Sequence, residues 1–294
     1  MHHAVLITAY RHPDYLLEMA DFLDDRFSLF IHYDKRSSIE AGVLQQLKNH
    51  PRVRFFSQQY KVNWAGINHL HAILLLLREA LKTDAAVFHT ISGQDFPAMT
   101  CDQIDDIFRK NPERQYLEHF PMPAGHWKHG GMHRIWYWYF FDLFDHKSKS
   151  GNLINRIIRR VQTTLGVKRK WPTHLPSLNG GAAWWSITRS CASYIMDFSD
   201  THPLLLKRLR FTLCPEELFF QTIVMNSPMA NEVISDHMRY IDWNNRNGNS
   251  PANLDETDLG KIVHSGKLFA RKFESSVSDR LLVDLKHRLN SPET

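Results

Sequence analysis

Cysteine is scarce in this chain. The 294 residues contain three cysteines, Cys101, Cys191 and Cys214, which lie far apart without any C-x-x-C spacing. Disulfide frameworks and thiolate metal sites both need several thiols at characteristic spacings, so neither is indicated. We expect free, buried thiols.

Long apolar runs are also missing. No run approaches the roughly 18 to 20 residues needed to cross a bilayer. The N-terminus passes from Met-His-His directly into the strand-like segment Ala4-Val5-Leu6-Ile7, without a signal-peptide pattern. Because 43% of the residues are hydrophobic, there is ample material for a packed core. The sequence predicts a globular protein with a cytoplasmic location.

Several common catalytic signatures are absent. The chain has no G-x-G-x-x-G, G-x-x-x-x-G-K-[ST], G-x-S-x-G or H-E-x-x-H motif, which argues against dinucleotide-binding, P-loop, hydrolase-elbow and zincin proteins. His126, His129 and His133 have spacings that could share a helix face, but Gly130-Gly131 interrupts that helix and no carboxylate joins them. A metal site there is not favoured.

Positive charge is present in excess and is concentrated. The formal net charge is +5 and the isoelectric point is near 9.0, which favours an anionic partner. Residues 146–170 contain eight Lys or Arg and no Asp or Glu, with Leu153, Ile157 and Val161 among the apolar residues at near-helical spacing. This segment is predicted to be a basic amphipathic helix that either packs on the domain surface or docks on an anionic membrane face.

Strand and helix signals alternate through the first third of the chain. Strands are predicted at 3–9, 27–34, 53–56 and 85–91, and helices at 13–24, 67–81 and 101–109. This order predicts an α/β protein with a Rossmann-type, mostly parallel sheet flanked by helices. Ligands of such sheets bind beyond the carboxyl ends of the strands, here at the loops 8–12, 34–37 and 92–97.

The remaining chain is predicted to complete a single domain over 1–294. An aromatic, histidine-rich and then basic stretch, 118–176, reads as an insertion that covers the acceptor side of the sheet. A loop and strand at 180–188 and a helix at 189–199 follow, and the segment after Met238 is expected to be rich in loops until a helix at 278–289.

Polar motifs follow the predicted strands. Asp34, beside Lys35 and Arg36, either forms a structural ion pair or holds a ribose or base edge. Asp95 lies in a polar turn that is either structural or part of a pocket. The run Leu268-Phe269-Ala270-Arg271-Lys272-Phe273 places two cations among apolar residues. Buried cations need anionic partners, and a diphosphate would be a suitable one.

Two adjacent carboxylates stand at the start of a predicted amphipathic helix, in Cys214-Pro215-Glu216-Glu217-Leu218-Phe219-Phe220. Proline suits the first turn of a helix, and acidic residues there complement the helix dipole. Capping alone explains this pattern, but a carboxylate at this position could also act as a general base.

Together these motifs resemble one family, the Core-2/I-branching enzymes, which comprise β-1,6-N-acetylglucosaminyltransferases and peptide O-xylosyltransferases. The matching elements follow the family order: Ile31 to Ser37, Asn63-Trp64-Ala65-Gly66, Ser92 to Pro97, Gly181 to Trp185, Pro215-Glu216-Glu217, and Phe269 to Phe273. The resemblance implies a GT-A-like fold, a UDP-sugar donor and inverting transfer without a required metal or other cofactor. Consistently, the chain contains no D-x-D metal-binding motif.

The resemblance also implies roles for individual residues. Glu217 matches the catalytic base, and Lys272, with Arg271 beside it, matches the diphosphate-binding lysine; Arg239 matches a second diphosphate contact. The other donor-binding matches are Thr8, Ala9, Tyr10, Asp34, Lys35, Val62, Asn63, Trp64, Ala183, Trp184 and Ser250. Asp95, Glu118 and Arg134 are expected near the acceptor. Ala183 departs from the xylosyltransferases, which carry an acidic residue there, so the donor sugar stays open between N-acetylglucosamine and xylose.

The sequence therefore predicts an inverting glycosyltransferase that moves a sugar from UDP to a hydroxyl of a glycan, a lipid-linked saccharide or a peptide. Peripheral membrane contact through 146–170 is an additional expectation. A carbohydrate-binding protein without activity is one alternative, since Trp-rich loops also stack on sugars. A nucleic-acid-binding protein is less favoured, because Lys and Arg cluster in one insertion instead of interleaving with aromatic residues on a sheet face.

Overall fold

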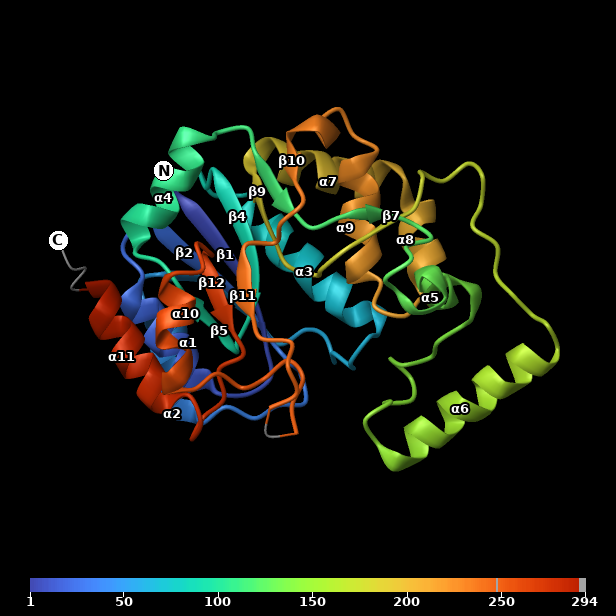
Figure 1. Cartoon of the computed structure of the whole chain (residues 1–294), viewed down its shortest axis with the longest axis horizontal. Coiled ribbons are helices and arrows are strands. Elements are labelled where there is room, and N and C mark those ends of the chain that lie inside the picture. The colour runs from blue at the N-terminus through green and yellow to red at the C-terminus, as the bar shows by residue number, and fades with distance from the viewer. Residues whose placement is uncertain (247, 291–294) are drawn as a thin grey trace.

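The computed structural model describes residues 1–246 and 248–290 and is built around a seven-stranded sheet (Figure 1). The strand order is β10-β6-β9-β4-β1-β2-β3. β9 pairs antiparallel with both β4 and β6, whereas the other pairs are parallel. The predicted mostly parallel α/β sheet is confirmed. The strands are β1 (His3–Ala9), β2 (Phe27–Tyr33), β3 (Val53–Ser57), β4 (Val87–Ser92), β6 (Gln115–Leu117), β9 (Trp185–Thr188) and β10 (Val233–Ile234).

Helices cover both faces of the sheet, so its central strands are apolar on both sides. Along β1, Val5 and Ile7 pack into one hydrophobic cluster, and Ala4 and Leu6 pack into another. The first cluster includes side chains of α1 (Pro13–Phe22), α2 (Ala41–Asn49), α4 (Cys101–Lys110), α10 (Leu259–Val263) and α11 (Asp279–Asn290). The second includes side chains of α3 (Ile67–Ala80), α7 (Arg189–Thr201), α8 (Pro203–Leu209) and α9 (Glu216–Met225).

The strand register brings the predicted ligand loops together. Thr8 lies opposite His32 on β2 and Ser92 on β4, so β1, β2 and β4 end at the same edge of the sheet. The loops that follow these three strands are thus neighbours: the amide of Asp34 donates to Ala9 and that of Gly93 donates to Thr8. This carboxyl edge is where ligands of doubly wound sheets bind.

The C-terminal region is more regular than expected. β11 (Arg239–Ile241), β12 (Phe269–Arg271) and β5 (Asp95–Pro97) form a second sheet in the order β11-β12-β5, and α10 lies between β11 and β12 in the chain. The segment is rich in loops, as expected, but its short elements were not predicted because strands of three residues are too short to show a periodicity. This small sheet carries Arg271 to the carboxyl edge, where it lies opposite Asp95.

The segment 118–176 contains β7 (Phe120–Pro121), which pairs with β8 (Asn179–Gly180), and three short or exposed helices. These are a 3-10 turn at Lys128–Gly131, α5 (His133–Trp136) and α6 (Lys149–Thr164). Two further 3-10 turns lie at Ala230–Glu232 and Glu256–Asp258. Figure 1 shows α6 standing away from the body of the protein. The predicted basic helix is confirmed. Within residues 1–246 and 248–290, no helix combines the length and apolar character that crossing a membrane requires.

Candidate active site

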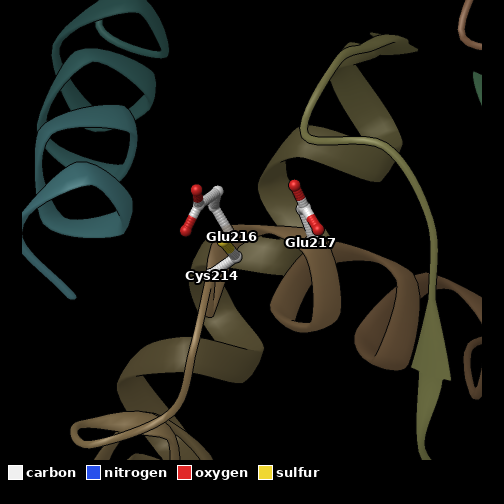
Figure 2. A group of neighbouring side chains, drawn as sticks. All are labelled: Cys214, Glu216 and Glu217. Atoms are coloured by element: carbon white, nitrogen blue, oxygen red, sulfur yellow. The ribbon is translucent and has the colours of Figure 1, made fainter. Parts of the chain in front are cut away.

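Glu217 lies in the first turn of α9, which begins where the chain reverses direction. Cys214 adopts a positive φ of 49°, and Pro215 caps the helix. The residues of α9 from Leu218 to Val224 are buried all round, so the expected amphipathic pattern was wrong. Burial on all sides fixes the helix in the core and gives the two glutamates at its start a defined position. Figure 2 shows their side chains leaving the helix in different directions, with Glu216 facing α3.

The Glu217 carboxylate is held by an arginine from the segment 118–176. Arg134 Nη1 donates to Glu217 Oε2 at 2.5 Å, and the Arg134 guanidinium lies 3.8 Å above the ring of Trp127. Burial raises the pKa of Glu217 to about 7. The positive charge of Arg134 opposes this rise, and the negative charge of Glu216 adds to it. The side chain nevertheless remains 27% exposed. An accessible carboxylate with a pKa near neutrality is suited to exchange protons with a substrate.

Glu216 connects α9 to the end of β1. His69, in the first turn of α3, lies 3.0 Å from Glu216 Oε1 through Nδ1 and 3.1 Å from Thr8 Oγ1 through Nε2. Glu216 is buried, and its Oε2 atom has no hydrogen-bond partner in the part of the chain that the structure describes. Capping of the helix, which explains acidic residues at this position, is therefore not the whole role of Glu216, because its side chain also connects α9 to α3 and β1 through His69.

Cys214, Glu216 and Glu217 offer three potential metal-ligand atoms within 4.8 Å of one another. Burial, reinforced by the two carboxylates, raises the pKa of Cys214 well above its ordinary value, so its thiol stays protonated. Metal binding requires the thiolate. Arg134 and His69 already occupy the carboxylates. The donor set thus fits proton transfer better than it fits a metal ion.

The loop before β9 is tied to α9. The amide of Gly181 donates to Glu217 O at 3.0 Å, and Gln221 Nε2 donates to Ala182 O at 2.6 Å. A Cβ atom on Gly181 would lie 1.9 Å from Glu118 O, so only glycine fits this close approach. Ala183 and Trp184, which follow, are buried. The predicted donor-sugar loop therefore has a fixed position relative to Glu217.

Arg271 continues this series of contacts to the small sheet. Its guanidinium lies 4.5 Å from the centroid of the Trp184 ring, and its Nε atom is 3.0 Å from Asp95 Oδ1. Asp95 is buried and also accepts hydrogen bonds from the amide and hydroxyl of Ser92. The acceptor contact of Asp95 stays a prediction, and in the structure its enclosed carboxylate lies against Arg271.

Lys272 lies among other cations. Burial lowers its pKa, and the nearby charges of Arg11, Arg271 and Lys147 lower it further against the opposing effect of Glu274. Among the residues that the structure describes, none accepts a hydrogen bond from the Lys272 ammonium group or forms an ion pair with it. A half-buried, unpaired cation in a positive surrounding favours an anionic ligand.

Tyr10 lies close to two of these cations, at the end of β1. Arg11 Nη2 donates to the Tyr10 hydroxyl at 2.6 Å, and the Lys147 ammonium group is 5.9 Å from the ring centroid. Gln94 joins the same region, since it donates to Phe273 O at 3.1 Å and accepts from the Tyr10 hydroxyl at 3.4 Å. The predicted strand-end residue and the predicted cation pair thus lie in one region.

The nucleotide-loop residues form a connected group around Asp34. This carboxylate is buried and accepts from the amide of Val62 at 2.8 Å and from the Arg36 amide and side chain. Burial alone would raise the pKa of Asp34, but these hydrogen bonds hold that pKa below its ordinary value. Asn63 is buried and donates to Phe141 O at 2.6 Å, whereas Trp64 is 51% exposed and stacks on His146. The structural ion pair considered for Asp34 is present, and Trp64 is available as a platform for a planar ligand.

Other predicted contacts are not brought to this region as expected. Arg239 is fully buried, and both of its Nη atoms donate to protein acceptors, including Ser186 Oγ, Thr90 O and Trp185 O. Burial lowers its pKa to about 9. This position does not support the expected diphosphate contact and instead ties β11 to the main sheet. Ser250 is exposed and donates to Trp243 O. Lys35, by contrast, is exposed beside Asp34 at the carboxyl edge.

Sequence reasoning missed several residues that shape the site. His69, Arg11, Lys147 and Asp142 were not singled out, and Arg134 was expected at the acceptor instead of on Glu217. Asp142 caps α3 through the amide of Ile67 at 2.7 Å. The only available signal was the position of His69 just after the Asn63-to-Gly66 motif; the other contacts join segments that are distant in sequence.

A protein-family model matches most of the chain. The family model described as "Core-2/I-Branching enzyme" matches residues 4–263. The chain belongs to the Core-2/I-branching enzyme family. The enzyme class expected from the sequence, a glycosyltransferase, is confirmed at the level of the family, and the strand order confirms the mostly parallel α/β sheet.

Two curated relatives in this family are xylosyltransferases. Xylosyltransferase 2 of Rattus norvegicus is 25% identical over 283 residues, which cover 88% of this chain and 30% of the rat protein. Xylosyltransferase 1 of Homo sapiens is 25% identical over 281 residues, covering 88% of this chain and 27% of the human protein. This Core-2/I-branching chain thus spans less than a third of these relatives.

A solved structure with a similar chain path is S. aureus TarS 1-349 in complex with UDP-GlcNAc. It has a TM-score of 0.39 and 13% sequence identity, and the match covers 89% of this chain and 64% of that chain. A similarity of this size is compatible with the fold and bears no further weight.

Proposed function

We propose that the protein is an inverting glycosyltransferase that transfers N-acetylglucosamine or xylose from a UDP-sugar to an acceptor hydroxyl without a required metal. The observation that carries this proposal is the state of Glu217: an accessible carboxylate with a pKa of about 7, held by Arg134 and connected through Gly181 to the donor-sugar loop. Family membership supports the reaction class.

Glu217 is proposed as the general base. In a single displacement, its carboxylate removes the proton of the acceptor hydroxyl while that oxygen forms a bond to the anomeric carbon. The bond from this carbon to the diphosphate oxygen breaks on the opposite face, and UDP leaves with the bonding electrons. Only one acid/base group is needed for this step, so Glu216 remains free for its structural contact with His69.

Lys272 and Arg271 are proposed to offset the negative charge that develops on the leaving diphosphate. The Lys272 ammonium group is unpaired among the described residues, and Arg271 is held in place by Asp95 and Trp184. Fixed cations of this kind stabilise a leaving phosphate group as a divalent metal does in other enzymes. Arg11 and Lys147 lie near Lys272, and we include them among the cations that offset the charge of the diphosphate.

The nucleoside is proposed to lie at the carboxyl ends of β1 and β2. Thr8, Ala9, Tyr10, Asp34, Lys35 and the loop Val62–Asn63–Trp64 surround this edge. Asp34 is already paired with Arg36. It would therefore bind uridine only if the ligand replaced Arg36; otherwise its carboxylate would position Arg36 and the amide of Val62. The exposed Trp64 ring can stack on a base or a sugar.

A thermal-shift screen with UDP, UDP-N-acetylglucosamine, UDP-xylose and UDP-glucose tests donor binding. A donor at about 100 times its Kd should stabilise the fold by about 2.7 kcal/mol, or about 5 °C. We expect the same shift in EDTA and a much smaller one in Lys272→Met. A shift that requires Mn²⁺ would contradict the cation pair. Hydrolysis of a bound UDP-sugar without acceptor would exclude the alternative of a carbohydrate-binding protein without activity.

A further inference from the structure

The attachment of α6 to the rest of the protein includes hydrogen bonds from two polar side chains. Gln162 forms two hydrogen bonds with the backbone of Trp138, accepting from N at 2.8 Å and donating to O at 3.1 Å. Asn155 Nδ2 donates to Phe144 O at 2.8 Å. Surface helices normally place their apolar stripe against the core. Here the side that faces the protein combines the polar Asn155 and Gln162 with the half-buried Ile154 and Ile158, and the apolar stripe continues beyond them.

The apolar stripe of α6 is left open. Leu153, Ile157, Val161 and Leu165 are spaced by four residues and therefore lie along one side of the helix. Their exposed fractions are 59%, 54%, 50% and 69%. None of the four belongs to any hydrophobic cluster formed by the described residues. A groove of about 380 Å³ beside this stripe is lined by Trp138, Phe140, Ile157, Ile158, Val161 and Gln162.

Basic side chains border the stripe. Three cations of α6 are exposed: Lys149, Arg156 and Arg160. Because successive residues of an α-helix are rotated by about 100°, these three lie on the same side of the helix as Leu153, along one edge of the stripe. The segment 146–170 contains no Asp or Glu, so no acidic group of this segment offsets their charge. A helix with an open apolar stripe and a purely cationic border is complementary to a surface that has an apolar interior and an anionic boundary. An anionic lipid bilayer has this chemistry.

The start of α6 is adjacent to the donor region. Asp145 pairs with Arg36 at 3.0 Å, His146 stacks on Trp64, and Lys147 lies over the Tyr10 ring. A membrane contact through α6 would hold the carboxyl edge of the sheet near the lipid surface. An acceptor whose saccharide is attached to a lipid would then meet the donor without leaving the membrane.

From these contacts we propose that α6 docks the protein on an anionic membrane surface through the stripe Leu153, Ile157, Val161 and Leu165 and the flanking cations Lys149, Arg156 and Arg160. The contact is interfacial, with the helix axis parallel to the surface. It does not depend on the proposed transfer reaction, because it involves neither Glu217 nor the donor-binding cations.

Sedimentation of the full chain with lipid vesicles tests this proposal. The vesicles contain phosphatidylcholine with about one part in four phosphatidylglycerol, or phosphatidylcholine alone. The wild-type chain should bind the anionic vesicles, bind the neutral ones much less, and be released by salt. Arg156→Gln/Arg160→Gln should weaken binding about 30-fold, since each cation near the surface contributes about 1 kcal/mol. Ile157→Ser/Val161→Ser should abolish binding.

Matched controls change exposed residues elsewhere. Arg54→Gln/Arg280→Gln removes the same charge, and Leu204→Ser/Val283→Ser removes two apolar side chains that are also exposed. Both controls should bind vesicles as the wild type does, and all four variants should keep the wild-type melting temperature and the UDP-induced thermal shift. Failure of the wild type to bind anionic vesicles, or unchanged binding by Ile157→Ser/Val161→Ser, would overturn the proposal. A wild-type dimer that this variant converts to monomer, without vesicle binding, would make the stripe an interface between two copies.

Discussion

Replacing Arg134 by glutamine should change the pH at which the enzyme works. The substitution removes the cation 2.5 Å from Glu217 Oε2 and leaves the carboxyl group in its buried setting. Burial already raises the pKa of Glu217 to about 7, and Arg134 opposes that rise. Without Arg134 the pKa of Glu217 must therefore be higher still.

The size of the change follows from the contact that is lost. A hydrogen bond to a charged group contributes about 1.5–3 kcal/mol, and each pKa unit corresponds to about 1.4 kcal/mol. The midpoint of the acidic limb of the pH–rate profile should move upward by about one to two pH units. The base acts in its ionised form, which is populated above its pKa. Activity near pH 7 should thus fall about 5- to 50-fold, because half of the base is ionised at that pH in the wild type, and should recover as the pH rises.

The assay is UDP release from the donor identified by the thermal-shift screen, measured between about pH 5.5 and 9.5. Arg134→Lys, which retains the charge, is the matched control and should show a smaller displacement of the midpoint. An unchanged or lower midpoint in Arg134→Gln would refute the assignment of Arg134 to the base. Loss of activity at every pH would instead indicate that Arg134 binds the acceptor, as the sequence first suggested.

Other substitutions separate the roles of neighbouring groups. The raised pKa of Glu217 stabilises the fold below about pH 4.5, and this contribution is lost as the pH rises through about 7. Glu217→Gln should therefore have a free energy of unfolding up to about 3 kcal/mol higher than that of the wild type at pH 8, with a smaller difference at pH 5; calorimetry showing the reverse trend would contradict the burial argument. Lys272→Met should weaken UDP binding about 10- to 100-fold in titration calorimetry without lowering the melting temperature of the free protein, and unchanged affinity would remove Lys272 from the donor site. His69→Ala deprives Glu216 Oε1 of its partner and should cost about 1–3 kcal/mol in urea unfolding; no loss of stability would mean that water replaces the imidazole.

The sequence was most informative where apolar runs are long. The strands around Val5, Leu29 and Phe88 are buried on both faces, and such runs show their type and limits directly. The helices α2 and α8 were not anticipated, because their short apolar patterns are no clearer than those of loops. The three-residue strands β11 and β12 were missed for the same reason, although they carry Arg239 and Arg271.

The candidate site was predictable in its chemistry and much less in its contacts. Glu217, Arg271 and Lys272 follow from motifs that are continuous in sequence. The Arg134–Glu217 and Asp95–Arg271 pairs join residues that are 83 and 176 positions apart, and nothing in the local sequence specifies such pairings. Arg239 shows the reverse case, since the family resemblance implied a ligand contact and the fold places the side chain in the interior. An arginine flanked by apolar residues can satisfy its donors with backbone carbonyls, which a sequence motif does not reveal.

The role of Glu217 as the base is tested by UDP release from the wild type and from Glu217→Gln, each saturated with the same UDP-sugar in excess EDTA. We expect steady release by the wild type and a decrease of about 100- to 10,000-fold in the variant, with equal affinity of both proteins for UDP. Release by Glu217→Gln at the wild-type rate would contradict Glu217 as the base. A wild-type enzyme that is inactive in EDTA and restored by Mn²⁺ would contradict transfer assisted by Lys272 and Arg271 alone.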